Sequence, residues 1–80
     1  MKRILITGAA SGIGLATAKR FHEKGWRVGL TDVNETALAR LARELDNSWY
    51  RPLDVTDSIA CEHACRGFAE DGGTDVLFNC

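Results

Sequence analysis

Apolar and polar positions along the chain fall into blocks that predict strands and helices in turn. Residues 4–7 form a short continuous apolar and β-branched run closed by a glycine, which is typical of a strand buried on both faces. Residues 26–31 and 75–80 are similar and predict a second strand and the start of a fourth. Residues 48–53 predict a third strand, and Pro52 places it at a sheet edge because proline cannot donate to a ladder.

The segments between these runs have the periodicity of helices. Residues 11–24 predict a helix that ends at Gly25 and has an inner stripe of Ile13, Ala16, Thr17 and Phe21. Residues 35–45 follow the N-cap candidate Asn34 and carry apolar side chains at i, i+3, i+4 and i+7, namely Leu38, Leu41, Ala42 and Leu45. Residues 57–69, capped by Thr56 or Asp57, repeat this spacing at Cys61, Ala64, Cys65 and Phe68.

This alternation of strand and helix predicts the fold class and the domain organisation. Short loops join the elements throughout, as in βαβ units with right-handed crossovers. The expected fold is α/β, with a parallel sheet covered by helices on both faces. The chain has 80 residues, so residues 1–80 are expected to form one unit.

Composition and charge exclude several classes of partner. The 10 basic and 11 acidic residues give a net charge of −1, so no electrostatic attraction to nucleic acid or to an anionic membrane is expected. The opening apolar run is too short for an export signal, and no stretch approaches the roughly 20 apolar residues that span a bilayer. Cys61, Cys65 and Cys80 form neither a disulfide framework nor a zinc motif, which favours a reducing, cytoplasmic location with these thiols as small core residues.

A glycine-rich turn between the first strand and the first helix is the strongest chemical signal. It reads Thr-Gly-Ala-Ala-Ser-Gly-Ile-Gly over residues 7–14. Gly8 allows a tight turn, Gly12 lets the backbone approach a phosphate, and Gly14 permits close packing of helix on strand. The helix N-terminus supplies free N–H groups and a partial positive charge, so a pyrophosphate is the expected guest. A nucleoside-triphosphate P-loop is not supported, because no Gly-Lys-Ser/Thr follows.

Asp32 ends the second strand, where its carboxylate is placed to accept hydrogen bonds from the hydroxyls of an adenosine ribose. A carboxylate at this position also repels a 2′-phosphate. The loop of residues 9–11 has no Arg or Lys to attract that phosphate, so NAD is favoured over NADP.

In combination these residues resemble the short-chain dehydrogenase/reductase family along the whole chain. Thr7-Gly8-x-x-x-Gly12-Ile13-Gly14 matches its cofactor motif, Asp32 its NAD-selecting acid, and Asp54-Val55 a pair that contacts adenine. Asn79 matches the first residue of its Asn-Asn-Ala-Gly motif, whereas Cys80 departs from the second. The resemblance implies a Rossmann-type sheet of order 3-2-1-4 and a cofactor site formed by Gly8, Ser11, Gly12, Ile13, Gly14, Asp32, Asp54, Val55 and Asn79.

The resemblance also implies a function. Family members are NAD(P)-dependent oxidoreductases that move a hydride between the cofactor and an alcohol or carbonyl substrate, and a homo-oligomer is expected at full length. Their catalytic Ser and Tyr-x-x-x-Lys lie beyond the fourth strand, so residues 1–80 are interpreted as the NAD-binding half-domain ahead of the catalytic region, with no catalytic residue assigned. Tyr50 is interpreted as structural, because Asp54 stands where that motif has Lys.

Two alternatives remain open. A noncatalytic NAD-binding module would have the same residues over this stretch. A methyltransferase-like domain that binds S-adenosylmethionine would also combine a glycine-rich first loop with an acid after the second strand, although Thr7 and the Gly12-Ile13-Gly14 ending argue against it.

Overall fold

A computed structural model describes residues 1–79 as seven alternating elements. They are β1 (Arg3–Ile6), α1 (Gly12–Glu23), β2 (Arg27–Asp32), α2 (Glu35–Glu44), β3 (Trp49–Pro52), α3 (Ser58–Glu70) and β4 (Val76–Phe78). Each predicted boundary between residues 4 and 75 lies within one residue of the observed one. The fourth strand was predicted to run to Cys80, which lies outside the described residues.

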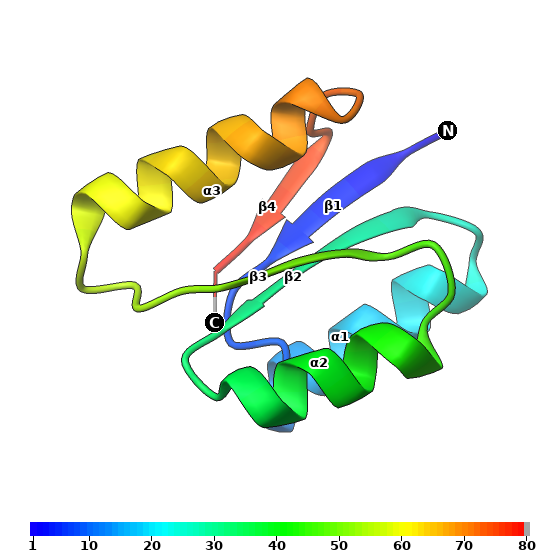
Figure 1. The fold of residues 1–80 in the computed structure, drawn as a ribbon. Helices are drawn as coiled ribbons and strands as arrows, with labels where there is room; N and C mark the ends of the chain where they lie inside the picture. The colour runs from blue at the N-terminus through cyan, green and yellow to red at the C-terminus, as the bar shows by residue number, and fades with distance from the viewer. Residues whose placement is uncertain (80) are drawn as a thin grey trace.

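The four strands form one parallel sheet in the order β3-β2-β1-β4, which confirms the predicted α/β class and strand order. Helices α1 and α2 cover one face of the sheet and α3 covers the other (Figure 1). Pro52 lies in the edge strand β3, as its missing N–H requires. All four residues of β1 are buried, because this strand has a neighbour on each side and helices above and below it.

Two helix caps predicted from the sequence are present. The Asn34 side chain accepts a hydrogen bond from the Ala37 N–H at 3.1 Å and so caps α2. Asp57 caps α3 in the same way, through the Ala60 N–H at 3.0 Å. Each cap satisfies one of the backbone donors that a helix start leaves without an intrahelical partner.

The inner stripe predicted for α1 is wrong by one position. Gly14 and Ala18 are the buried residues of this helix, whereas Ile13 is 72% exposed and Ala16 is exposed. Only Phe21 of the predicted stripe packs against the core, in edge-to-face contact with Trp26. The close approach of Gly14 to the β1–α1 turn sets the rotation of the helix, so Gly14 and Ala18 face the sheet.

The cysteines of α3 are also placed differently from the prediction. Cys61 is only half-buried and Cys65 is exposed, so neither is a core residue. Ala64 and Phe68 form the inner face of α3, and the Phe68 ring stacks at a tilt on Trp49 of β3. Cys80 lies outside the described residues.

Arg3 joins the start of β1 to the loop that precedes β4. Its side chain is 9% exposed and donates to the carbonyls of Gly73 at 2.6 Å and Phe68 at 3.1 Å. It also forms an ion pair with Asp71 at 3.0 Å, and Arg27 reaches the same carboxylate oxygen at 2.8 Å. Hydrogen bonds from Arg27 and then from Arg3 lower the pKa of Asp71 below its ordinary value of 3.8.

Within residues 1–79, no helix is both long and apolar enough to cross a membrane.

Candidate functional site

The turn between β1 and α1 lies at the carboxyl end of the sheet, beside the end of β2. Gly8 and Gly12 have φ angles of 65° and 58°, a left-handed backbone that residues with a side chain rarely adopt. The Ala9 N–H donates to the Thr31 carbonyl at 2.9 Å, which holds the turn against the neighbouring strand. A Cβ at Gly12 would have no atom within 4 Å, so the backbone there faces open space.

Gly14 has a different role, which is to let α1 approach the turn. A Cβ at this position would lie 2.0 Å from the Gly8 carbonyl oxygen and 2.7 Å from its carbon. Both are backbone atoms, so no side chain can move aside to make room. The predicted use of Gly14 in close packing is therefore confirmed by geometry, and it positions the N-terminus of α1.

The backbone N–H groups at a helix start have no intrahelical acceptor, so the start of α1 offers donors beside the glycine turn. The first turn of α1 consists of Gly, Ile, Gly and Leu, so no acidic side chain of the helix itself offsets the positive end of its dipole. Ser11 occupies the N-cap position with an extended backbone. Within the described part of the chain, residues 1–79, its hydroxyl makes no capping hydrogen bond. This combination of donors, dipole and hydroxyl is suited to a bound anion.

Asp32 is the acidic residue of the site, at the end of β2. One carboxylate oxygen accepts the Ala10 N–H at 3.0 Å, and the other accepts the Asn34 N–H at 2.9 Å. The hydrogen bond from Ala10 joins the β1–α1 turn to the end of β2 and fixes the carboxylate beside the glycine turn. A carboxylate has about four acceptor positions, so two are left for the hydroxyls of a ligand.

A hollow of about 150 Å³ opens beside this carboxylate. It is lined by Gly8, Asp32, Val33, Leu53 and Val55, from the ends of three strands. Val33 and Val55 are 69% and 51% exposed, so the rim of the hollow offers apolar surface to a ligand. Val33 and Leu53 were not predicted from the sequence. Each is an apolar residue that directly follows the last residue of a strand, Asp32 or Pro52, and that position is the signal that would have identified them.

The structure brings Val55 to this hollow but does not place the Asp54 side chain there. Asp54 lies in the turn after β3, where its carboxylate accepts hydrogen bonds from the Thr56 hydroxyl at 2.7 Å and the Thr56 N–H at 2.9 Å. These two bonds, the hydroxyl first, lower the pKa of Asp54 below 3.8. Its carboxylate therefore stabilises the turn that carries Val55.

Asn79 lies on the other side of the glycine turn, after β4. Its side-chain oxygen accepts a hydrogen bond from the Thr7 hydroxyl at 2.8 Å, which joins the ends of the neighbouring strands β1 and β4. Both residues line a second hollow of about 150 Å³, together with both described cysteines and apolar side chains of the sheet. Tyr50 lies within β3, paired with Leu30 and away from the glycine turn.

Taken together, one edge of the sheet offers three features to a ligand. The start of α1 suits an anionic group, Asp32 suits a pair of hydroxyls, and the hollow between Val33 and Val55 suits a flat apolar ring. The predicted residues Gly8 and Asp32 line the same hollow, whereas Ser11, Gly12 and Ile13 lie on the exposed start of α1.

Comparison with known proteins shows which family the chain is similar to. The sequence model of the short chain dehydrogenases matches residues 2–80. A serine 3-dehydrogenase of Agrobacterium fabrum is 43% identical over 74 residues, which are 91% of this chain and 29% of that protein. A 2-keto-3-deoxy-L-fuconate dehydrogenase of Xanthomonas campestris pv. campestris is 43% identical over 79 residues, which are 99% of this chain and 25% of that protein. The chain thus spans less than a third of the length of these relatives.

Solved structures agree in fold. An actinorhodin polyketide ketoreductase with NADPH superposes with a TM-score of 0.92 and 33% identity, over 99% of this chain and 32% of that one. A short chain dehydrogenase/reductase from Burkholderia phymatum, in complex with NAD, gives a TM-score of 0.91 and 31% identity, over 95% of this chain and 29% of that one. Proteins similar to this chain therefore bind both forms of the dinucleotide.

Proposed function

The chain belongs to the short-chain dehydrogenase family, and on that premise we propose that it forms the NAD-binding portion of an oxidoreductase. The cofactor's pyrophosphate lies over the start of α1, its adenosine ribose at Asp32, and its adenine between Val33 and Val55. The complete protein transfers a hydride between NAD(H) and a small alcohol or carbonyl substrate, as a homo-oligomer. Residues 1–80 carry the cofactor's binding groups, and we assign no catalytic residue among them.

The single observation that carries this proposal is the position of the Asp32 carboxylate. The Ala10 N–H holds it beside the glycine turn, so an acceptor for ribose hydroxyls and the donors for phosphate lie on one edge of the sheet. A dinucleotide presents its phosphates and its adenosine ribose in this order, one directly after the other. The remaining assignments, to Ser11, Ile13, Asp54 and Asn79, follow from the family resemblance.

The choice of NAD over NADP follows from charge. A 2′-phosphate on the ribose would stand where Asp32 already has a negative charge, and residues 9–11 supply no cation against it. The relatives bind NAD, NADP or NADPH, so the preference of this chain depends on its own residues.

We test the assignment by replacing Asp32 with alanine. Hydrogen bonds between a charged group and a ligand contribute roughly 1.5 to 3 kcal/mol each, so the loss of one weakens binding by about tenfold to 150-fold. We expect Asp32→Ala to lower the affinity for NAD by at least the smaller factor, and to leave NADP binding unchanged or improved. Calorimetric titration of both cofactors against both proteins measures these affinities.

Two further variants separate ribose recognition from damage to the turn. Asp32→Asn keeps an acceptor for a backbone N–H but removes the charge, so it should retain the fold and relax the preference for NAD. Asp46→Ala removes an exposed carboxylate beyond α2, at the opposite end of the sheet, and serves as the matched control. If Asp32→Ala weakens NAD and NADP equally, Asp32 does not recognise the ribose and the NAD assignment is wrong.

A further inference from the structure

Two thiols of α3 line one hollow, on the side of the sheet that α3 covers. The hollow has a volume of about 150 Å³, and we call it the thiol hollow after Cys61 and Cys65. It is also lined by Thr7, Asn79 and apolar side chains of the sheet and of α3. Cys61 is half-buried, Cys65 is exposed and both are free thiols, so a small reagent can reach them from solvent.

The spacing of the two cysteines decides what they can bind together. Cys61 and Cys65 are four residues apart on one helix, so they are neighbours on its surface, with Cβ atoms about 5 to 6 Å apart. A disulfide requires Cβ atoms about 3.5 to 4.5 Å apart, so the two sulfurs cannot bond to each other while the helix is intact. A single atom between them can bond to both. The pair therefore fits a ligand atom that forms two bonds to sulfur.

The surroundings of the pair favour trivalent arsenic as that atom. Zinc sites use three or four protein ligands, and among residues 1–79 no group of three or more His, Cys, Asp or Glu side chains could hold a metal ion. Trivalent arsenic needs only two sulfurs when its third bond is already made to carbon. Within the described part of the chain no charged side chain lines the thiol hollow, so a carbon substituent meets a neutral and largely apolar wall. An apolar cavity of about 150 Å³ is large enough for a benzene molecule, so a phenyl group is a suitable substituent.

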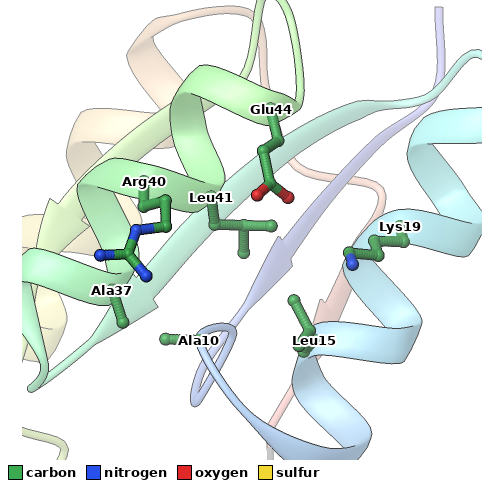
Figure 2. Close-up of a pocket in the computed structure, with 7 residues that line it drawn as sticks. All are labelled: Ala10, Leu15, Lys19, Ala37, Arg40, Leu41 and Glu44. Atoms are coloured by element: carbon green, nitrogen blue, oxygen red, sulfur yellow. The ribbon is translucent and has the colours of Figure 1, made fainter.

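The groove on the opposite face of the sheet has a different chemistry. It lies between α1 and α2 and has a volume of about 190 Å³ (Figure 2). Lys19, Arg40 and Glu44 stand around it, and none of the described residues that line it is a cysteine. A neutral reagent that bonds to sulfur therefore finds no partner in that groove, whereas the thiol hollow offers both thiols together.

We propose that the thiol hollow is a binding site for a trivalent organic arsenical, with the arsenic bonded to the sulfurs of both Cys61 and Cys65. In water such a reagent carries two hydroxyl groups on arsenic. Each cysteine sulfur forms a bond to arsenic, and each displaced hydroxyl leaves as water with the proton of one thiol. Arsenic stays trivalent throughout, so the reaction consumes no oxidant and no reductant. The organic group on arsenic occupies the apolar part of the hollow.

Occupation of this site affects the nucleotide site through Val55. The Cys61 thiol donates a hydrogen bond to the Val55 carbonyl, with sulfur and oxygen 3.5 Å apart. Binding of arsenic removes the thiol proton and, with it, this hydrogen bond. Leu53 and Val55 line both the thiol hollow and the hollow beside Asp32, so the segment that carries them is common to both. This second step rests on the proposed function, because it assumes that the adenosine of the cofactor contacts Val55.

Calorimetric titration with phenylarsine oxide tests the site. Every protein carries Cys80→Ser, so that Cys61 and Cys65 are its remaining thiols. We compare this two-thiol chain with Cys61→Ser and Cys65→Ser, each with one thiol, and with a spacing control that combines Cys65→Ser with Arg66→Cys. The spacing control keeps two thiols but places them five residues apart, on different faces of α3. Amide NMR spectra show that each protein is folded before titration.

Two simultaneous attachments of one ligand raise its affinity by about 10²- to 10⁴-fold over a single one. We therefore expect each one-thiol chain and the spacing control to bind phenylarsine oxide at least about 100-fold more weakly than the two-thiol chain. Mass spectrometry of the intact complex should show one arsenic per chain. Dithiothreitol, which is a dithiol, should remove the arsenic at a concentration at which a monothiol does not.

The link to the nucleotide site is measured by titration of adenosine 5′-monophosphate into the two-thiol chain before and after loading with phenylarsine oxide. We expect the loaded chain to bind the nucleotide about tenfold more weakly, the equivalent of one buried valine side chain. The amides of residues 53–57 should shift on loading, because Val55 loses the hydrogen bond from Cys61.

Equal affinity of phenylarsine oxide for the two-thiol chain and for either one-thiol chain would overturn the site, and so would equal affinity for the spacing control. An unchanged nucleotide affinity after loading would overturn the link through Val55 but not the site. A folded chain that binds phenylarsine oxide as expected, but binds no adenosine 5′-monophosphate in either state, would support the dithiol site and overturn the proposed function.

Discussion

Gly14 and Gly12 differ in what a side chain would meet, and this difference makes a sharp test of the site. Alanine at position 14 would place its Cβ 2.0 Å from the Gly8 carbonyl oxygen, more than 1 Å inside any normal contact, and the obstacle is backbone. Alanine at position 12 would meet nothing within 4 Å, and its only difficulty is the φ of 58°. Gly14→Ala should therefore damage the fold, and Gly12→Ala should mainly impair ligand binding.

The magnitudes follow from these contacts. Overpacking lowers the free energy of unfolding by about 1 to 3 kcal/mol, and sometimes by more. The overlap at Gly14 cannot relax through movement of a side chain. We therefore expect Gly14→Ala to lower the free energy of unfolding by at least about 2 kcal/mol, after the gain in helix propensity from alanine is subtracted. A domain of this size loses about 4 to 8 °C in Tm per kcal/mol, so Gly14→Ala should lower Tm by roughly 8 °C or more. A left-handed φ costs a residue with a side chain about 1 to 2 kcal/mol, so Gly12→Ala should lower Tm by less.

The assay is thermal unfolding followed by circular dichroism, combined with calorimetric titration of adenosine 5′-monophosphate. Gly25→Ala is the matched control for Gly12→Ala, because Gly25 has a φ of 83° and open space around it but lies at the far end of α1. Gly12→Ala and Gly25→Ala should be destabilised alike, and only the first should bind the nucleotide more weakly. If Gly14→Ala is as stable as the wild type, α1 does not depend on this approach and our account of the turn is wrong.

Two further predictions concern stability. The pKa of Asp71 is lowered in the folded state, so its contribution to stability is present above its unfolded value of about 3.8 and is lost as pH falls below that value toward the folded pKa. The Tm of Asp71→Asn should therefore lie below that of wild type at pH 6, and the difference should shrink as pH falls below 3.8 toward the folded pKa. A constant difference would contradict the linkage, and Glu70→Gln is the control. Asn34→Ala removes the side-chain cap of α2 and should cost about 1 kcal/mol, measured as a lower Tm, while Thr36→Ala in the first turn should cost less.

The strands and their order could be predicted because the signals are local and strong. The buried strands β1 and β2 are continuous apolar runs, and Pro52 excluded β3 from the interior of the sheet. Helix α2 has large apolar residues on a single face, and Leu38 and Leu41 are buried there as expected. In these elements the largest apolar side chains are also the buried ones, so periodicity alone identifies the inner face.

Prediction failed where packing depends on a contact that helical periodicity does not encode. The approach of Gly14 to Gly8 rotates α1 and leaves Ile13 outside, although Ile13 is the more hydrophobic residue. Cys65 has the right spacing for the core of α3, but the helix is oriented by Phe68 and Ala64. In the site, Asp32 could be predicted from its place at the end of a strand, whereas Val33 became visible only when the hollow beside that carboxylate was known.

The bonds of Arg3 have a consequence for how the chain folds as it is synthesised. Arg3 is made well before its partner Asp71, which lies 68 residues later. At about 5 to 20 residues per second, a ribosome needs roughly 3 to 14 s to add that stretch. During this interval the guanidinium lacks the partners that it has in the folded chain, and β1 has no β4 to pair with. Strand β1 is thus made before the other three strands, and its second edge is paired only when β4 has been made, so the nascent chain carries an open strand edge for seconds.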